Sequence, residues 1–338
     1  MQIGSISRIR CTARLAQRIF MWFIQQKDTE KANEVIMRTT NDNTIRALRS
    51  IELTVPDLDA ASTFYRDVWG LDLVDSGKDA HYLRGTGAEH HIVVLRRGAS
   101  AALRRINFAA NSKSAVDTLY QRLGQGGVML LGNPAPLDEP GGGYGFALVE
   151  PDGRELRVLS DLIPHRNCAD APDRPRKLSH IVLNTSDADA ATTFFTGSLG
   201  FRISDQTRMM DFLRCNSDHH SLALARMGGP SLNHIAFEVP SFDALMRGCG
   251  RLKENGCKVE WGIGRHGPGN NVFAYFVDPH GFAIEYTAEF QQVDDATHKP
   301  GLPQDWVRPA NRVDQWGFAD PPSDRMRNAM HGQLSTHR

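Results

Sequence analysis

The 338-residue chain has few cysteines and no excess of charge of either sign. Its five cysteines are odd in number and include no CxxC pair, which argues against both a disulfide framework and a zinc knuckle. A reducing cytoplasm is the expected compartment. The 39 basic residues equal the 39 acidic residues in number, so nothing indicates binding to nucleic acid or to an anionic membrane surface. Small neutral or weakly anionic partners are favoured.

Long apolar runs are also lacking, since none approaches the roughly 20 residues that a bilayer-spanning helix needs. We therefore expect a soluble protein. The first 26 residues contain basic but no acidic residues, and they include the short apolar run 19–24. This pattern is compatible with an organelle transit peptide or a weak amphipathic anchor, but it lacks a small-residue cleavage site. The favoured interpretation is an extension over residues 1–46 that lies outside the fold, with Met37 a plausible alternative start.

An internal duplication organises the rest of the chain. Residues 51–73 and 181–203 align without a gap, and each reads as a strand, an Asp-rich helix start, a helix with an aromatic pair and another strand. Two further pairs of segments repeat at similar spacing, 103–127 with 232–256 and 145–160 with 274–287. Each half therefore contains two modules of strand, helix and further strands. The Pro-, Arg- and Asp-rich stretch 161–177 between the halves is typical of an exposed linker.

Three residues of the second half, His180, His234 and Glu285, lie on strand-like apolar segments. Two imidazoles and one carboxylate form the donor set that holds non-haem Fe(II) by one face. Any one of them alone could equally be a hydrogen-bonded structural residue or an ion-pair partner. Their counterparts in the first half cannot hold a metal cation, because a hydroxyl and two guanidinium groups offer no suitable set of lone pairs. These counterparts are Ser50, Arg105 and Arg157.

Residues 47–292 resemble the type I extradiol catechol dioxygenases of the vicinal oxygen chelate superfamily. The resemblance is carried by LSHIVL, DHHSLALA, LNHIAFEV and GRHGPGNNVFAYFVDPHGFAIEY in the second half. It implies an α+β fold of four βαβββ modules, paired into two open barrel-like domains of which only the C-terminal one holds metal. The implied domains are a non-metal barrel over 47–160, the linker 161–177, a catalytic barrel over 178–292 and a C-terminal arm over 293–338.

The same resemblance implies a site that holds Fe(II), or alternatively Mn(II), through His180, His234 and Glu285, with O2 as co-substrate. His220 would be the catalytic acid and base. Strand alternation predicts that its neighbour His219, whose role is unassigned, faces the other side.

His266 and Tyr275 would be both catalytic and substrate-binding, and Asn270 and Asn271 of the same loop would also contact substrate. The chain has Gly269 where some family members have an Asp.

The implied function is extradiol (meta) cleavage of a catechol-type aromatic by dioxygen, with a muconic semialdehyde-type product, in the breakdown of aromatic compounds. The partners would be a small aromatic diol and further copies of the chain, but neither nucleic acid nor membrane. Two alternatives remain open: another metal-dependent superfamily enzyme (isomerase, epimerase or thiol transferase), or a non-catalytic small-molecule binding protein. The arm could be a lid with Trp306, Arg312 and Trp316, although a loosely packed tail or a subunit contact is equally compatible with its composition.

Overall fold

The computed structural model describes residues 44–307 and 309–332. Nearly all of the predicted N-terminal extension 1–46 thus lies outside the described residues, as do the last six residues of the arm. The first strand, β1, begins at Ile45. Among the described residues, no helix is long and apolar enough to cross a membrane.

Four modules, each of one strand, one helix and three strands, follow one another along the chain. The first half contains β1 (Ile45–Val55), α2 (Leu58–Thr63), η1 (Phe64–Val68), β2 (Asp72–Ser76), β3 (Ala80–Arg84) and β4 (Val93–Arg97), then β5 (Ala102–Ala110), α3 (Lys113–Gln125), β6 (Leu130–Pro136), β7 (Tyr144–Val149) and β8 (Glu155–Ser160). The second half contains β9 (Lys177–Asn184), α4 (Ala188–Thr193), η2 (Phe194–Ser198), β10 (Arg202–Gln206), β11 (Met210–Arg214) and β12 (Leu222–Ala225), then β13 (Ser231–Glu238), α5 (Phe242–Glu254), β14 (Trp261–Arg265), β15 (Val272–Val277) and β16 (Ala283–Ala288). A last helix, α6 (Asp324–Met330), lies in the C-terminal arm.

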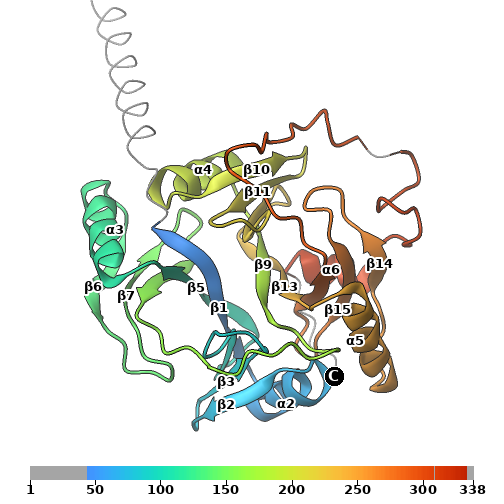
Figure 1. Cartoon of the computed structure of the whole chain (residues 1–338), viewed down its shortest axis with the longest axis horizontal. Helices are drawn as coiled ribbons and strands as arrows, with labels where there is room; N and C mark the ends of the chain where they lie inside the picture. The colour runs from blue at the N-terminus through green and yellow to red at the C-terminus, as the bar shows by residue number, and fades with distance from the viewer. Residues whose placement is uncertain (1–43, 308, 333–338) are drawn as a thin grey trace, which may run out of the picture. The chain divides into compact units, whose positions relative to one another are not determined.

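The modules pair into two eight-stranded sheets with the same strand order (Figure 1). The first runs β2-β3-β4-β1-β5-β8-β7-β6 and the second β10-β11-β12-β9-β13-β16-β15-β14. In each sheet the first strands of two modules are antiparallel neighbours at the centre. Within the described residues the two edge strands of each sheet are not paired with one another, so both sheets are open. The predicted α+β fold of four βαβββ modules in two open barrel-like sheets is confirmed.

Side-chain caps set the helix starts that the sequence suggested. Asp57 and Asp187 each accept a hydrogen bond from the backbone of the first helical turn of α2 and α4. Both helices continue as a π-helical turn, η1 or η2, that carries the aromatic pair of the repeat. In η1, Tyr65 is fully buried, so the aromatic pair serves packing.

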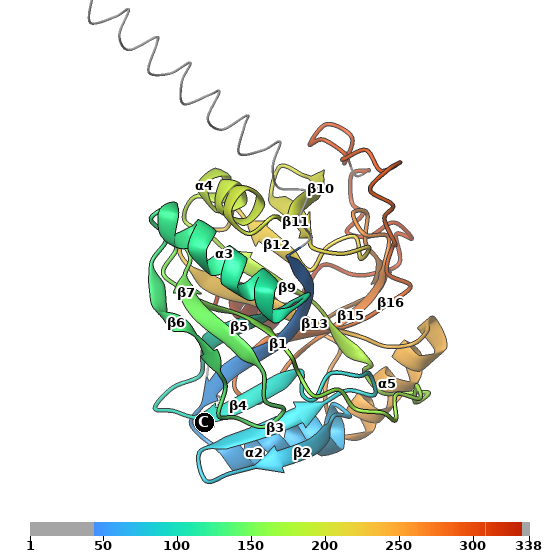
Figure 2. The same ribbon diagram turned by 60° about the vertical axis from the view of Figure 1, so that its left-hand side comes forward.

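The first module of the N-terminal half packs against the last module of the C-terminal half. The Tyr65 hydroxyl donates to Asp278 Oδ2 at 3.0 Å, which joins η1 to the turn between β15 and β16. Trp69 stacks on Tyr286 of β16 with ring centroids 3.9 Å apart. Figure 2 shows the resulting proximity of α2 to α5. The apolar core is accordingly continuous across the two halves.

Helices α5 and α6 cover opposite faces of β15 and β16. Alternate residues of these strands point to opposite faces, so each helix contacts a different set of side chains. On one face, Gly248 of α5 packs so closely on Tyr286 that an added Cβ would lie 2.6 Å from its ring. On the other face, Met326 of α6 is buried in a cluster with Phe273 and Tyr275. Tyr275 pairs with Glu285 across the two strands, so α6 lies on the side of the sheet that carries the predicted site.

Candidate metal centre and active site

The three central strands of the second sheet bring His180, His234 and Glu285 together. Ala236 of β13 pairs with His180 of β9 on one side and with Glu285 of β16 on the other. The register between β9 and β13 shifts between Leu232 and His234, and His234 then pairs with Val182. Glu285 Oε2 lies 3.3 Å from Nε2 of His180 and 3.3 Å from Nε2 of His234.

These side chains fit a metal ion by their chemistry and by what they leave unsatisfied. All three are buried, and one potential ligand atom from each lies within 4.8 Å of the other two. Neither His234 Nε2 nor Glu285 Oε2 makes a hydrogen bond of acceptable geometry. Buried polar atoms that remain unpaired at a shared point are expected where an ion normally completes the site. The predicted ligands therefore converge as a set in the structure.

A chain of amides fixes the tautomer of His234. The Met330 carbonyl at the end of α6 can only accept, so Asn184 Nδ2 donates to it at 2.7 Å. Asn184 Oδ1 then accepts from Asn233 Nδ2 at 2.9 Å, and Asn233 Oδ1 faces His234 Nδ1 at 2.8 Å. The proton of His234 is consequently on Nδ1, and Nε2 presents a lone pair to the metal position.

Glu285 is held on its other oxygen by the loop before β15. Asn271 is fully buried and donates to Glu285 Oε1 at 3.3 Å and to Thr287 Oγ1 at 2.7 Å. Burial alone would raise the pKa of Glu285, but the His180 and His234 imidazoles lower it well below its ordinary value. The carboxylate is therefore anionic at neutral pH, as a metal ligand must be.

His220 lies against the ligand His180, with ring centroids 4.4 Å apart. Phe212 and Phe290 enclose its ring at 5.0 and 4.8 Å. Burial, followed by the neighbouring His180 and His219, holds the pKa of His220 well below its ordinary value. The ring is thus a neutral imidazole at neutral pH.

The expectation that His219 faces away from His220 is wrong. Both rings are buried on the same side, and their Nδ1 atoms lie 2.9 Å apart. The reason is that both residues precede β12, which begins at Leu222, so strand alternation does not apply to them. His219 Nε2 in turn lies 2.7 Å from Asp205 Oδ2.

His266 and Tyr275 meet beside the ligands. His266 Nε2 lies 3.0 Å from the Tyr275 hydroxyl and 3.9 Å from Glu285 Oε1. The His266 ring stacks on Phe273, and the Tyr275 ring makes an edge contact with the His234 ring at 5.1 Å. The predicted catalytic pair thus lies beside the three candidate ligands.

The intervening loop separates the two predicted asparagines. Asn271 points inward to Glu285, whereas Asn270 is exposed and its side chain accepts from Gln315 at 3.2 Å. Gly269, which directly precedes them, has a φ of +80°, and a Cβ there would lie 3.2 Å from His220 Cε1. The glycine that departs from the family pattern therefore lets the loop backbone lie directly on His220.

The C-terminal arm contacts this loop rather than extending away from it. Gln315 donates to the His266 carbonyl, and Trp306 packs on Gly267, where an added Cβ would lie 3.3 Å from the indole. Trp316 is 42% exposed and lies against Arg265. Arg312 flanks Gly317 further along the arm. These contacts place the arm beside the site, and its role as a lid stays a prediction.

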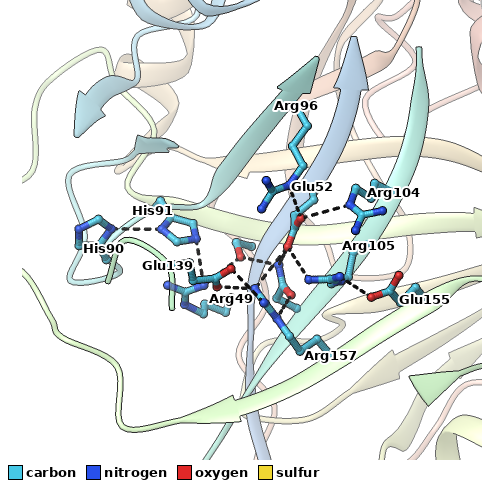
Figure 3. A network of polar contacts seen from close by, with 12 residues as sticks. Arg49, Glu52, His90, His91, Arg96, Arg104, Arg105, Glu139, Glu155 and Arg157 are labelled. Carbon is cyan, nitrogen blue, oxygen red and sulfur yellow. Dashed lines mark hydrogen bonds and ion pairs between the residues drawn. The ribbon is translucent and has the colours of Figure 1, made fainter. Parts of the chain in front are cut away.

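In the first sheet the equivalent positions hold a network of buried charges (Figure 3). The strand registers confirm that Ser50, Arg105 and Arg157 correspond to His180, His234 and Glu285. At the centre lies Glu52, which is fully buried. It is paired with four arginines at 3.0 to 3.8 Å, namely Arg96, Arg104, Arg105 and Arg157.

The first half also contains a histidine pair that the sequence comparison missed. Val93 pairs with Ile51 as Leu222 pairs with Ile181, so His90 and His91 correspond to His219 and His220. Their Nδ1 atoms lie 3.1 Å apart. Comparison of EHHIVVL with DHHSLALA would have found them, at an offset one residue shorter than that of the helices.

Asn184, Asn233 and Asp205 also went unpredicted. Asn233 directly precedes His234, but nothing in the sequence indicates which polar neighbour its amide contacts.

Comparison with known proteins adds to this geometry. The family model of the Glyoxalase/Bleomycin resistance protein/Dioxygenase superfamily matches residues 47–158 and 177–286. Among curated proteins, the chain is 34% identical over 122 residues to metapyrocatechase 2 of Cupriavidus necator. It is 31% identical over 157 residues to an iron-dependent extradiol dioxygenase of Rhodococcus jostii. These alignments cover 35% and 41% of this chain and span 38% and 50% of the two relatives.

A solved structure matches much more of the molecule. The Mn(II)-bound glyoxalase from Novosphingobium aromaticivorans is 40% identical and superimposes with a TM-score of 0.79. The match covers 83% of this chain and 94% of that one. The fold is thus shared over nearly the whole of the neighbour.

Proposed function

Because this chain belongs to the Glyoxalase/Bleomycin resistance protein/Dioxygenase superfamily, we propose that it is an extradiol dioxygenase that cleaves a catechol-type aromatic diol beside its hydroxyl groups. The observation that carries the proposal is the convergence of His180, His234 and Glu285, with His220 against His180 and the His266–Tyr275 pair against His234 and Glu285. The names of the curated relatives support the same reaction. We expect a cytoplasmic enzyme of aromatic degradation.

His180 and His234 would hold the metal through Nε2, and Glu285 would hold it through a carboxylate oxygen. The donor set suits Fe(II) and Mn(II) alike, and we propose Fe(II) as the resident ion. When bound, the metal supplies Lewis acidity and a path for electrons between an aromatic diol and dioxygen. The net charge of two neutral imidazoles and one carboxylate leaves that ion cationic, which favours binding of an anionic diol.

The surrounding residues would handle protons and orient the substrate. His220 is neutral and adjacent to the ligands, so it can accept a proton from a diol hydroxyl and later return it. The Tyr275 hydroxyl and His266, which lie beside His234 and Glu285, can hydrogen-bond a substrate oxygen. Phe212 and Phe290 around His220 exclude water from this proton transfer.

A second candidate is an isomerisation of the glyoxalase class, favoured by the 40% identity to the Mn(II)-bound glyoxalase. Against it, the described residues hold only three metal-ligating side chains in one cluster, and the histidines and tyrosine around them suit oxygen chemistry. The glyoxalase reaction consumes no dioxygen, so the two candidates differ in one measured quantity.

The test is oxygen uptake by protein purified anaerobically and loaded with Fe(II). A panel of mono- and bicyclic catechols should consume one dioxygen per ring and form a yellow semialdehyde. A parallel assay with the thiohemiacetal of glutathione and methylglyoxal measures the second candidate. Turnover of the thiohemiacetal without oxygen uptake on any catechol would replace the dioxygenase by the glyoxalase proposal.

The duplication provides a matched control for this assay. His180→Ala should lose the bound metal and all ring cleavage, because one of three ligands is gone. Ser50→Ala makes the equivalent truncation in the first sheet, where it removes a hydroxyl that accepts from Asn107 at 3.0 Å. The metal content and oxygen uptake of Ser50→Ala should equal those of the wild type. Equal activity in His180→Ala would contradict the ligand assignment.

A further inference from the structure

His220 is held by a second histidine, and that histidine is held by a buried carboxylate. Asp205 of β10 is only 4% exposed. Its Oδ1 accepts from the backbone N–H of Gly301 at 2.6 Å, and its Oδ2 lies 2.7 Å from His219 Nε2. His219 Nδ1 lies 2.9 Å from His220 Nδ1. The three side chains form a continuous row from β10 to the metal ligands.

The donor and acceptor of each hydrogen bond in this row follow from the Asp205 carboxylate at its end. An ionised carboxylate has no proton to donate, so His219 Nε2 carries the hydrogen and donates to Asp205. A neutral His219 then has a bare Nδ1, which can only accept. The hydrogen of that bond must come from His220 Nδ1, which leaves Nε2 of His220 without a proton.

The opposite assignment requires an extra positive charge. If His219 carried protons on both nitrogens, it would donate to His220 and force the His220 hydrogen onto Nε2. That would place an imidazolium, paired with Asp205, in the wall of a site built for a divalent cation, where its charge would repel the ion. The neutral arrangement avoids this cost.

We propose that Asp205 and His219 are positioning residues that hold His220 as the Nδ1–H tautomer, with its bare Nε2 available as the base. This rests on the proposed function in one respect, because the proton accepted would come from the hydroxyl of an aromatic diol. In that step the substrate O–H bond breaks and an N–H bond forms on His220 Nε2. The substrate keeps the electron pair, and nothing is oxidised or reduced.

The first half shows how the row differs where the described residues form no cluster of metal-ligating side chains. His90 and His91 keep the same Nδ1 contact, at 3.1 Å. Asp75 occupies the strand position equivalent to Asp205, opposite Tyr82 as Asp205 is opposite Phe212, but it is exposed. His90 instead stacks on His165 with centroids 5.3 Å apart. At this strand position, the carboxylate is thus buried in the half that carries the candidate ligands and exposed in the other half.

The direct test is the tautomer of His220 in the metal-free full-length protein. Two-bond proton–nitrogen correlation spectra of a 15N-labelled sample distinguish a protonated from a bare ring nitrogen, and the signals of His220 are assigned by their loss in His220→Gln. We expect His220 protonated at Nδ1 and bare at Nε2. A wild-type spectrum with the proton on Nε2 of His220 would overturn the proposal without reference to any activity.

The variant Asp205→Asn tests the cause. Its amide can donate to His219 Nε2 and thereby reverse the row, as amides do in place of other histidine-orienting carboxylates. We expect the His220 proton to move to Nε2, and kcat on the best catechol to fall about 10²–10⁴-fold at unchanged Fe(II) content and KM. An unchanged tautomer in a folded Asp205→Asn protein would contradict the proposal.

Asp75→Asn is the matched control in the first half and should leave the tautomer of His220 and kcat unchanged. Failure of the two proposals can be told apart. If the wild-type protein has the expected tautomer but takes up no oxygen with catechols, the positioning role of Asp205 and His219 is supported and the dioxygenase proposal is contradicted. Oxygen uptake by a protein whose His220 has the opposite tautomer would support the dioxygenase proposal and contradict the positioning role of Asp205 and His219.

Discussion

In the second sheet two imidazoles and a carboxylate meet at a buried point, whereas the equivalent point of the first sheet holds Glu52 surrounded by arginines. Strand order and pairing register are the same in both. The backbone therefore fixes where three side chains meet, but the residue types decide what they hold. In one half the charge that balances a buried carboxylate would be a metal ion, and in the other it is guanidinium groups.

The largest expected effect comes from making the second sheet resemble the first. His234→Arg places a guanidinium where Arg105 lies in the repeat, next to Glu285. An always-protonated group cannot ligate and would repel a cation, so we expect no bound metal and a loss of oxygen uptake of at least about 10³-fold. Metal analysis and an oxygen electrode measure this. Metal retained by His234→Arg would contradict the inference that the residue types at these positions decide whether a sheet binds metal.

The next effect concerns stability in the first sheet. Glu52→Gln removes the anion that compensates buried arginines, so we expect a loss of about 3–5 kcal/mol in the free energy of unfolding. Urea unfolding followed by circular dichroism measures it. Glu155→Gln is the control: Glu155 is 22% exposed and forms an ion pair with Arg105, so we expect its loss to lower the free energy of unfolding by less than about 1 kcal/mol. Equal losses of unfolding free energy in the two variants would show that the buried position of Glu52 does not increase its contribution to stability.

A smaller effect should follow from releasing the tautomer of His234. Asn233→Ala removes the acceptor of the His234 Nδ1–H and leaves Asn184 Oδ1 unpaired. We expect metal affinity to fall about 10–100-fold with the fold intact. Competition with a chelator measures the affinity. An unchanged affinity would mean that the strand pairing alone orients the imidazole.

The smallest effect is a pH dependence shared by both halves. Burial is the largest cause that lowers the pKa of His91 and of His220 well below the ordinary value of 6.5. As the pH falls below about 6.5 these rings gain protons first in the unfolded chain, so stability present at higher pH is lost. The melting temperature of the metal-free protein should fall from pH 7.5 to pH 5.5. His91→Gln should make the slope shallower; an identical slope would show that His91 does not contribute.

Much of the architecture could be predicted from the sequence, because the internal duplication repeats the same pattern of strands and helices in both halves. The apolar strand segments, the helix-capping Asp57 and Asp187 and the aromatic pairs predicted the modules and their order. The wrong prediction, that His219 faces away from His220, came from applying strand alternation to residues that precede β12. The boundaries of strands depend on pairing with distant segments, which local sequence does not reveal.

The sequence by itself predicted the candidate ligand triad and its replacement in the first half, because residue type alone decides which side chains can bind a cation and the repeat aligns their positions. Only the tertiary structure decided how those groups are protonated and oriented. The amide row from Met330 to His234, and the row from Asp205 to His220, each join residues far apart in the chain. A hydrogen bond depends on atoms within about 3 Å of one another, and that proximity exists only after the sheets have paired.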